Sequence, residues 1–234
     1  MDERATRLLE RNADHVASLP EGYFDDVRDG QKPDVVSICC SDSRVSQAGM
    51  FEVSEPGELF TPSNIGNQVR DRVHDDGETR TVVDGSLLYP VVHTGTRTVA
   101  VVGHTQCGAV TAAYDHVTDG GSEPAGIQKL VDLLVPIVED ALDAGIVETA
   151  GRRGETIDRL VEYNVDSQVT FLGESDDLPA DTSVYGFVYD FHGRYGGPEG
   201  RVYLVNAGGD RDVESLQGRV GAPVRNQVAR LTSH

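Results

Sequence analysis

Two apolar runs stand out along a chain whose other segments are mostly polar and charged. The first extends from Val35 to Cys40 and the second from Thr96 to Gly103. Short runs of this kind, rich in valine, are typical of strands that are buried on both faces of a sheet. Glu58 to Thr61 is a weaker run of the same type. We therefore predict two strong buried strands and a third, weaker one.

Apolar residues near helical spacing predict helices in three further segments. These are Thr79 to Thr94, which contains Pro90, then Ile127 to Asp143, and Thr156 to Leu172. The last two carry their apolar residues toward one face, as helices that cover a sheet do. Strands that alternate with helices indicate an α/β fold.

The two ends of the chain carry different signals. Leucines and valines on a charged background predict an N-terminal helical arm within residues 1–33. Ser183 to Phe191 and Gly200 to Asn206 flank a glycine-rich turn, a pattern that predicts an antiparallel hairpin. Residues 207–234 are polar, and no element is predicted there. Because no repeat or linker divides the chain, we expect residues 1–234 to form a single domain.

Charge limits the partners that the protein can take. The net charge of the 234-residue chain is −19, and the acidic residues are spread along its whole length. A nucleic-acid binder concentrates arginine and lysine on one face, so nucleic acid is an unexpected partner. Lysine occurs only at Lys32 and Lys129. An acidic, lysine-poor surface suits a salt-rich cytosol, where screening weakens self-repulsion, and it predicts a halophilic source.

Cysteine content and apolar run lengths indicate the compartment. The three cysteines do not form an even-numbered disulfide framework of the secreted type. Neither a signal-peptide core nor an apolar run of roughly 20 residues, the length that a membrane span needs, is visible in the sequence. We therefore expect a cytoplasmic protein that does not bind membranes.

Two short polar segments, Cys40 to Arg44 and His104 to Cys107, follow the two strong strands directly. In open α/β sheets, binding sites gather at the carboxyl ends of strands, so we expect these segments to meet. Two cysteine thiolates and one histidine neutralise Zn²⁺ and leave the fourth tetrahedral position free. A free position is what hydration or hydrolysis requires, so the segments predict a catalytic zinc site.

Strand geometry separates the two adjacent cysteines. Successive side chains of a strand point to opposite faces, so Cys40 shares a face with Asp42 and Cys39 does not. We assign Cys40 as the ligand and expect Cys39 to pack as a small apolar residue. His104 and Cys107 are three residues apart, a spacing that brings two side chains to one face of a helical turn. The alternative is that both thiols belong to the core and that His104 caps a helix.

The segments Cys40-Ser41-Asp42-Ser43-Arg44-Val45 and Gly103-His104-Thr105-Gln106-Cys107-Gly108-Ala109 resemble the two signatures of the β-class carbonic anhydrases. The resemblance covers roughly Leu8 to Val205 and includes Glu55 to Phe60, Asn64 to Asn67 and Gly85 to Tyr89. It implies a zinc enzyme that interconverts carbon dioxide and bicarbonate. It also implies a mostly parallel central sheet with flanking helices, and a homodimer or dimer of dimers in which the N-terminal arm lies over the neighbour.

The resemblance assigns roles to particular residues. It implies that Cys40, His104 and Cys107 bind zinc, and that Asp42 and Arg44 control the fourth position. Two thiolates already neutralise the ion, so Asp42 as a further ligand would add net negative charge. A bidentate pairing with Arg44 holds Asp42 off the metal, but both arrangements of Asp42 stay open at this point.

A further implied role belongs to Gly108, whose backbone amide lies at a helix start and would bind a developing bicarbonate oxygen. The family often has arginine where this chain has Ser63. The proton shuttle is not identified, and the candidates are histidines that titrate near neutral pH: His74, His93, His116 and His192.

Two other functions fit the same residues. A related zinc site would hydrolyse carbon disulfide or carbonyl sulfide, which are linear and apolar like carbon dioxide. A non-catalytic zinc-binding regulatory protein is the second alternative. The presence of both Asp42 and Arg44 argues against it, because a closed structural site has no use for an arginine that withdraws a carboxylate.

Overall fold

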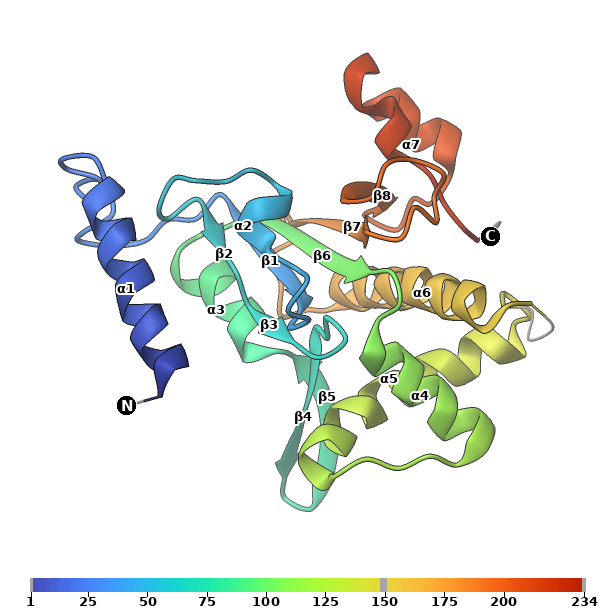
Figure 1. Ribbon diagram of the computed structural model, residues 1–234. Helices are drawn as coiled ribbons and strands as arrows, with labels where there is room; N and C mark the ends of the chain where they lie inside the picture. Colours follow the sequence, from blue (N-terminus) through green and yellow to red (C-terminus); the bar gives the residue numbers. More distant parts are fainter. Residues whose placement is uncertain (1, 148–150, 233–234) are drawn as a thin grey trace.

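The computed structural model describes residues 2–147 and 151–232 and is built around one central sheet (Figure 1). The sheet has six strands in the order β2-β1-β6-β7-β8, and β3 also pairs with β1. The strands are β1 (Val35–Cys40), β2 (Leu59–Phe60), β3 (Ser63–Asn64), β6 (Thr98–His104), β7 (Ser183–Asp190) and β8 (Arg201–Ala207). All pairings in this sheet are parallel except that of β7 with β8. The α/β class, the mostly parallel sheet and the antiparallel edge hairpin are therefore confirmed.

Alternating side chains of β1 and β6 separate two apolar clusters. Ile38 and Val101 belong to the larger cluster, on the face that α4 (Gly108–Asp119), α5 (Ala125–Asp143) and α6 (Arg153–Glu174) cover. Cys39 and Val102 belong to a smaller cluster with Phe51, which follows the short helix α2 (Gln47–Met50), on the opposite face. Both strands are buried from their second residue onward, which explains why their sequences are mostly apolar.

Helix α6 packs directly against two strand positions that are glycine. A Cβ at Gly103 or at Gly186 would lie 2.8 or 2.7 Å from a methyl group of Val165. Side chains there would push the helix away from β6 and β7. The close packing keeps α6 fixed relative to the carboxyl end of β6, which carries part of the candidate site.

The prediction of one helix over residues 79–94 is wrong in its first half. Strands β4 (Arg70–Asp75) and β5 (Glu78–Val83) form a separate antiparallel hairpin, and only α3 (Gly85–His93) is helical. Asp76 and Gly77 connect the strands with φ values of 48° and 82°, the left-handed conformation of a tight hairpin turn. The threonines and valines of β5 favour a strand, and Asp84 caps the start of α3.

Helix α1 (Glu3–Ser18) is the predicted N-terminal arm, and it contains no buried residue. It stands at one side of the molecule in Figure 1. Leu8, Leu9 and Val16 expose 66%, 60% and 59% of their surface. A helix with an apolar stripe that remains exposed has a face available for another surface.

The C-terminal segment is more ordered than its polar sequence suggested. It contains α7 (Val213–Arg219) and a 3₁₀ helix, η1 (Ala222–Gln227), and Val228 then pairs with Leu204 of β8. Beyond this pairing, Arg230 lies between two acidic residues of α6, Glu162 and Asp166. Residues 233–234 of this segment lie outside the described part of the chain. Among the described helices, none has the length and apolarity needed to cross a bilayer.

Candidate metal centre

The ends of two neighbouring parallel strands bring three potential metal ligands together. Cys40 is the last residue of β1, His104 is the last residue of β6, and Cys107 directly precedes α4. All three side chains are buried, and their ligand atoms lie within 4.8 Å of one another. Because β1 and β6 pair in parallel, their carboxyl ends meet at one edge of the sheet, as the sequence predicted.

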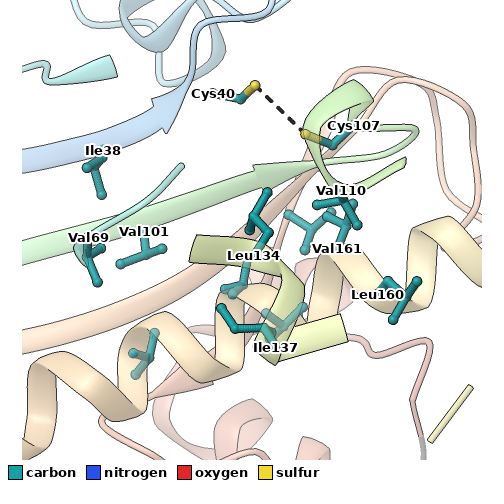
Figure 2. Close-up of a cluster of buried hydrophobic side chains, with 14 of the residues drawn as sticks. Ile38, Cys40, Val69, Val101, Cys107, Val110, Leu134, Ile137, Leu160 and Val161 are labelled. Carbon is teal, nitrogen blue, oxygen red and sulfur yellow. Dashed lines mark hydrogen bonds between the residues drawn. The ribbon is translucent and has the colours of Figure 1, made fainter. Parts of the chain in front are cut away.

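The two thiols face each other above the apolar cluster (Figure 2). The Cys107 and Cys40 sulfurs are 3.9 Å apart, and the Gly66 amide donates to the Cys40 sulfur at 3.5 Å. The hydrogen bond from Cys107 is the main cause that lowers the pKa of Cys40, and His104 and Gly66 contribute. The same bond, together with burial, raises the pKa of Cys107. One thiolate therefore forms readily, and binding of a metal displaces the proton that the pair shares.

His104 presents one ring nitrogen to the two sulfurs. Its Nδ1 atom donates to the Thr105 carbonyl at 3.0 Å, which leaves Nε2 unprotonated in the neutral ring. Nε2 is buried and has no hydrogen-bond partner among the described residues. A backbone carbonyl that fixes the tautomer is the usual support of a metal-binding histidine. Two thiols and an imidazole with a free Nε2 fit zinc.

His104 and Cys107 come together by a geometry other than the predicted helical turn. The two residues do not share a helical turn, because His104 ends the strand and Cys107 lies just before the helix. The residues between them form a turn in which Gln106 has a φ of 56°. This left-handed residue, and not helical periodicity, brings the two side chains together.

Cys39 lies on the other side of the sheet from the three ligands, as strand alternation predicted. It is fully buried in the small cluster with Ala100 and Val102. Burial raises the pKa of Cys39 to about 12, so its thiol stays neutral. A buried, neutral thiol among apolar neighbours is a core residue.

Asp42 and Arg44 form a tight pair beside the ligands. The Arg44 backbone amide and Nε donate to Asp42 Oδ1, both at 2.9 Å, and Nη2 donates to Oδ2 at 2.7 Å. These bonds hold the pKa of Asp42 well below its usual range. The Asp42 Oδ2 atom lies 3.8 Å from His104 Nε2, so the carboxylate borders the position that a metal would take.

Phe191 supports this pair from the loop after β7. The Arg44 guanidinium lies 4.6 Å above the Phe191 ring, and that ring stacks on His104 with centroids 5.5 Å apart. The aromatic ring therefore joins the arginine to a ligand and reduces the freedom of both. Sequence reasoning missed Phe191, because a single aromatic residue after a strand carries no specific signal.

Of the remaining candidates, Gly108 and His192 are adjacent to residues of this centre, and the other histidines make local contacts. Gly108 is the exposed first residue of α4, with open space where a side chain would be. His192 Nδ1 lies 2.8 Å from the hydroxyl of Thr105, next to His104. Ser63, at the position where the family often has arginine, accepts a hydrogen bond from Gln47. The other three histidines make local contacts with Thr79, Tyr89 and Gly121.

Asp158 is a further residue that sequence reasoning missed. It lies on α6 and accepts hydrogen bonds from Gln106, inside the turn that joins His104 to Cys107. Asp158, Glu162 and Asp166 are spaced by four residues on a helix with an apolar face, and all three are buried. Acidic residues at core spacing in an apolar helix are a signal that sequence reading could have used.

Together, the sheet and the buried Cys40, His104 and Cys107 define an α/β protein with a candidate metal centre. The family model of the carbonic anhydrases matches residues 35–194. A carbonic anhydrase of Emericella nidulans is 32% identical over 169 residues, which cover 70% of this chain and 67% of that protein. A carbonic anhydrase of Helicobacter pylori is 28% identical over 120 residues, so the match spans about half of each chain, 50% and 52%.

The chain is also similar to solved structures of β-carbonic anhydrases. The Coccomyxa β-carbonic anhydrase in complex with acetazolamide is 27% identical, with a TM-score of 0.65 and coverage of 95% of this chain and 94% of that chain. The tetrameric β-carbonic anhydrases of Sordaria macrospora share the fold at 20% identity, with a TM-score of 0.69 over 88% and 98% of the two chains. The protein belongs to the β class of the carbonic anhydrase family.

Proposed function

We propose that the protein catalyses the reversible hydration of carbon dioxide to bicarbonate and a proton, with zinc held by Cys40, His104 and Cys107. The observation that carries the proposal is the position of Asp42, next to the Nε2 atom of His104 and paired with Arg44. A structural site has no need of this pair. When bound in such a site, zinc acts as a Lewis acid and makes a hydroxide nucleophile available near neutral pH.

Asp42 and Arg44 control what enters the fourth coordination position. Both Asp42 oxygens accept hydrogen bonds from Arg44, and the low pKa of Asp42 keeps it an acceptor only. An ionised carboxylate can accept a hydrogen bond from a water or hydroxide nucleophile beside the metal. Its negative charge also repels competing anions. The pairing with Arg44 also favours the arrangement in which Asp42 is not itself a ligand.

Gly108 supplies a hydrogen-bond donor, in contrast to the acceptor oxygens of Asp42. The N-terminal amides of a helix carry a partial positive charge, and Gly108 begins α4 next to Cys107. We assign its amide to the oxygen of carbon dioxide that becomes negative during hydration. The open space at its Cα lets a substrate approach the backbone closely.

A stopped-flow assay of carbon dioxide hydration, with zinc analysis of the same sample, tests the proposal. We expect about one zinc per chain and a catalysed rate far above that of buffer. Carbon disulfide and carbonyl sulfide are assayed in parallel, because the ligands do not distinguish these linear molecules from carbon dioxide. Hydrolysis of the sulfur compounds without hydration would support that alternative, and zinc without either activity would support a regulatory role.

Arg44→Ala is expected to lower hydration activity while zinc content stays normal. Without its partner, Asp42 is free to turn toward the metal and occupy the fourth position. Loss of an outer residue of this kind typically costs about 10- to 100-fold in activity or metal affinity. Steady-state rates, zinc content and X-ray absorption at the zinc edge measure the change.

Arg44→Lys is the matched control, since lysine keeps the charge but cannot bind both oxygens in a fixed plane. Its activity should lie between those of the wild type and Arg44→Ala. A fully active Arg44→Ala enzyme with an unchanged metal coordination sphere would show that Arg44 does not withdraw Asp42.

We also propose that the chain forms a homodimer, or a dimer of dimers, in which α1 packs over the neighbouring subunit. The support is the exposed apolar stripe of α1, formed by Leu8, Leu9 and Val16. An exposed apolar stripe in a soluble protein usually marks an interaction surface. The cytoplasmic location and the salt-rich habitat remain predictions from composition.

Association of the subunits is expected to strengthen with salt. Each chain brings a net charge of −19, so a dimer joins two strongly acidic bodies. Raising ionic strength from about 0.1 M to about 1 M shortens the screening length from roughly 10 Å to roughly 3 Å. Sedimentation velocity and hydration rates across that range test the idea. A dimer that is complete and fully active at every salt concentration would show that the acidic surface does not affect assembly.

A further inference from the structure

We propose that Asp158 is a positioning residue of the metal centre, which holds the turn between His104 and Cys107 and thereby slows metal loss. The inference rests on the proposed zinc site but concerns a different residue. Asp158 lies on α6, about fifty positions further along the chain than the turn, and does not itself line the ligand triangle. Its effect on the metal is therefore transmitted through the backbone of Gln106.

The turn needs support because its conformation is unfavourable. Gln106 has a φ of 56°, a left-handed value that glycine adopts freely and that side chains with a Cβ disfavour. Gln106 also lies between two of the three potential ligands. A strained residue at such a position persists only when surrounding contacts hold it there. Relaxation of this backbone would change the separation of His104 and Cys107.

Asp158 makes the contacts that hold the strained residue. Its Oδ1 atom accepts the backbone amide of Gln106 at 2.9 Å and the side-chain Nε2 of Gln106 at 2.8 Å. The same Nε2 also donates to the carbonyl of Gly154, at the start of α6, at 2.8 Å. Both the backbone and the side chain of Gln106 are thus attached to one helix. Hydrogen bonds to an ionised acceptor are stronger than neutral ones.

Asp158 is itself fixed in place. Only 1% of its side chain is exposed, and Arg194 Nε lies 2.8 Å from its second oxygen, Oδ2. The helix that carries it packs closely on β6, because Gly103 leaves no side chain between them. The strand that ends in His104 and the helix that carries Asp158 therefore form one rigid support. The carboxylate acts as the link from that support to the turn.

Glu162 provides an internal comparison. It lies one helical turn beyond Asp158 on the same buried face of α6. Its oxygens accept from Leu231, Thr232 and Tyr195, so it binds the C-terminal segment and the loop after β7. A substitution at Glu162 disturbs the same helix without removing a contact to the metal-site turn. The two positions separate loss of turn support from general loss of stability.

The experiment measures the rate of zinc release from the fully loaded protein into an excess of a coloured chelator, under conditions where every variant is folded. We expect Asp158→Ala to release zinc about 10- to 100-fold faster than the wild type, the size typical of residues that orient ligands. Asp158→Asn keeps the shape of the side chain but not its charge, so its rate of zinc release should lie between those of the wild type and Asp158→Ala. Glu162→Gln should lower the unfolding midpoint and leave the rate of zinc release unchanged.

A second variant restores the turn by another route. Gln106→Gly removes the conformational strain, so Asp158 has less to hold. We expect Asp158→Ala combined with Gln106→Gly to release zinc more slowly than Asp158→Ala alone. If Asp158→Ala does not fold, Asp158→Asn with and without Gln106→Gly gives the same comparison. The absorption spectrum of the Co²⁺-substituted protein reports ligand geometry and should shift in Asp158→Ala but not in Glu162→Gln.

Release of zinc at the wild-type rate by the Asp158 variants would overturn the inference, as would equal acceleration by Glu162→Gln. The proposed function is tested separately, by the zinc content and the hydration rate of the wild-type protein. A wild-type protein that binds zinc and hydrates carbon dioxide, with Asp158 variants that do not release zinc faster, rejects only the role of Asp158. If the wild-type protein binds no zinc, the proposed function is rejected, and the role of Asp158, which depends on it, is rejected with it.

Discussion

Replacing Cys107 with serine is expected to remove zinc and hydration activity together. Cys107 is one of the three proposed zinc ligands, and its sulfur lies 3.9 Å from that of Cys40. A serine hydroxyl does not ionise near neutral pH and is a poor ligand for zinc, so two residues would remain to hold the ion. Structural zinc sites contribute on the order of 10 kcal/mol, and loss of one thiolate removes a large share of that binding energy. Metal analysis after dialysis and a hydration assay measure the result.

Cys39→Ser is the control for this prediction. Cys39 is as buried as Cys107 but lies in the small cluster on the opposite face of the sheet. A serine there places a hydroxyl in a buried cluster where Ser37 is its polar partner, 3.9 Å from the present sulfur, so stability should fall while zinc and activity remain in the folded protein. Zinc lost from Cys39→Ser and kept in a Cys40→Ser variant would reverse the assignment of the ligand. Zinc retained by Cys107→Ser would show that the ion is held elsewhere.

The second large effect is expected at Arg230, which has no hydrogen bond or ion pair with the three proposed ligands within the described part of the chain. Its side chain is 4% exposed and its Nη2 atom lies 2.7 Å from Asp166 and 3.3 Å from Glu162, both buried on α6. Arg230→Ala leaves the buried Glu162 without its cation and leaves Asp166 with only the more distant Arg211, whose Nη1 atom lies 3.9 Å from Oδ2. Breaking a buried ion pair from one side costs about 3–5 kcal/mol in the free energy of unfolding. Urea denaturation of the wild type and the variant measures the difference.

Two further variants test the cause of that loss. Arg80→Ala removes an arginine that is 63% exposed and pairs loosely with Asp75, and it should leave the denaturation midpoint unchanged. Arg230→Ala combined with Glu162→Gln and Asp166→Asn removes the stranded charges and should recover part of the lost stability. If Arg230→Ala alone destabilises by less than about 1 kcal/mol, the pair behaves as an exposed one and the buried-charge argument fails.

The central strands and the ligand segments could be predicted because their signals are local. A strand buried on both faces requires mostly apolar residues, and Val35 to Cys40, interrupted only by Ser37, and Val99 to Gly103 satisfy this. The same alternation of side chains separated Cys39 from Cys40 without knowledge of the partners. The prediction was wrong in one segment where the helical spacing of apolar residues competes with the alternation typical of a strand. The helix prediction for residues 79–94 includes residues 79–83, which belong instead to strand β5 of the hairpin that turns at Asp76 and Gly77.

The sequence by itself determined the type of fold and the chemistry of the candidate metal site. Both follow from residue types and their spacing: the apolar strands, and cysteine and histidine at the strand ends. Only the tertiary structure decided what holds these residues in place. Asp158 supports the left-handed turn at Gln106 from a position 52 residues further along the chain, and Arg230 pairs with Asp166, which lies 64 residues earlier. Hydrogen bonds and charge pairs of this kind leave no periodic trace in the chain, because they depend on distances that exist only after the helices have packed on the sheet.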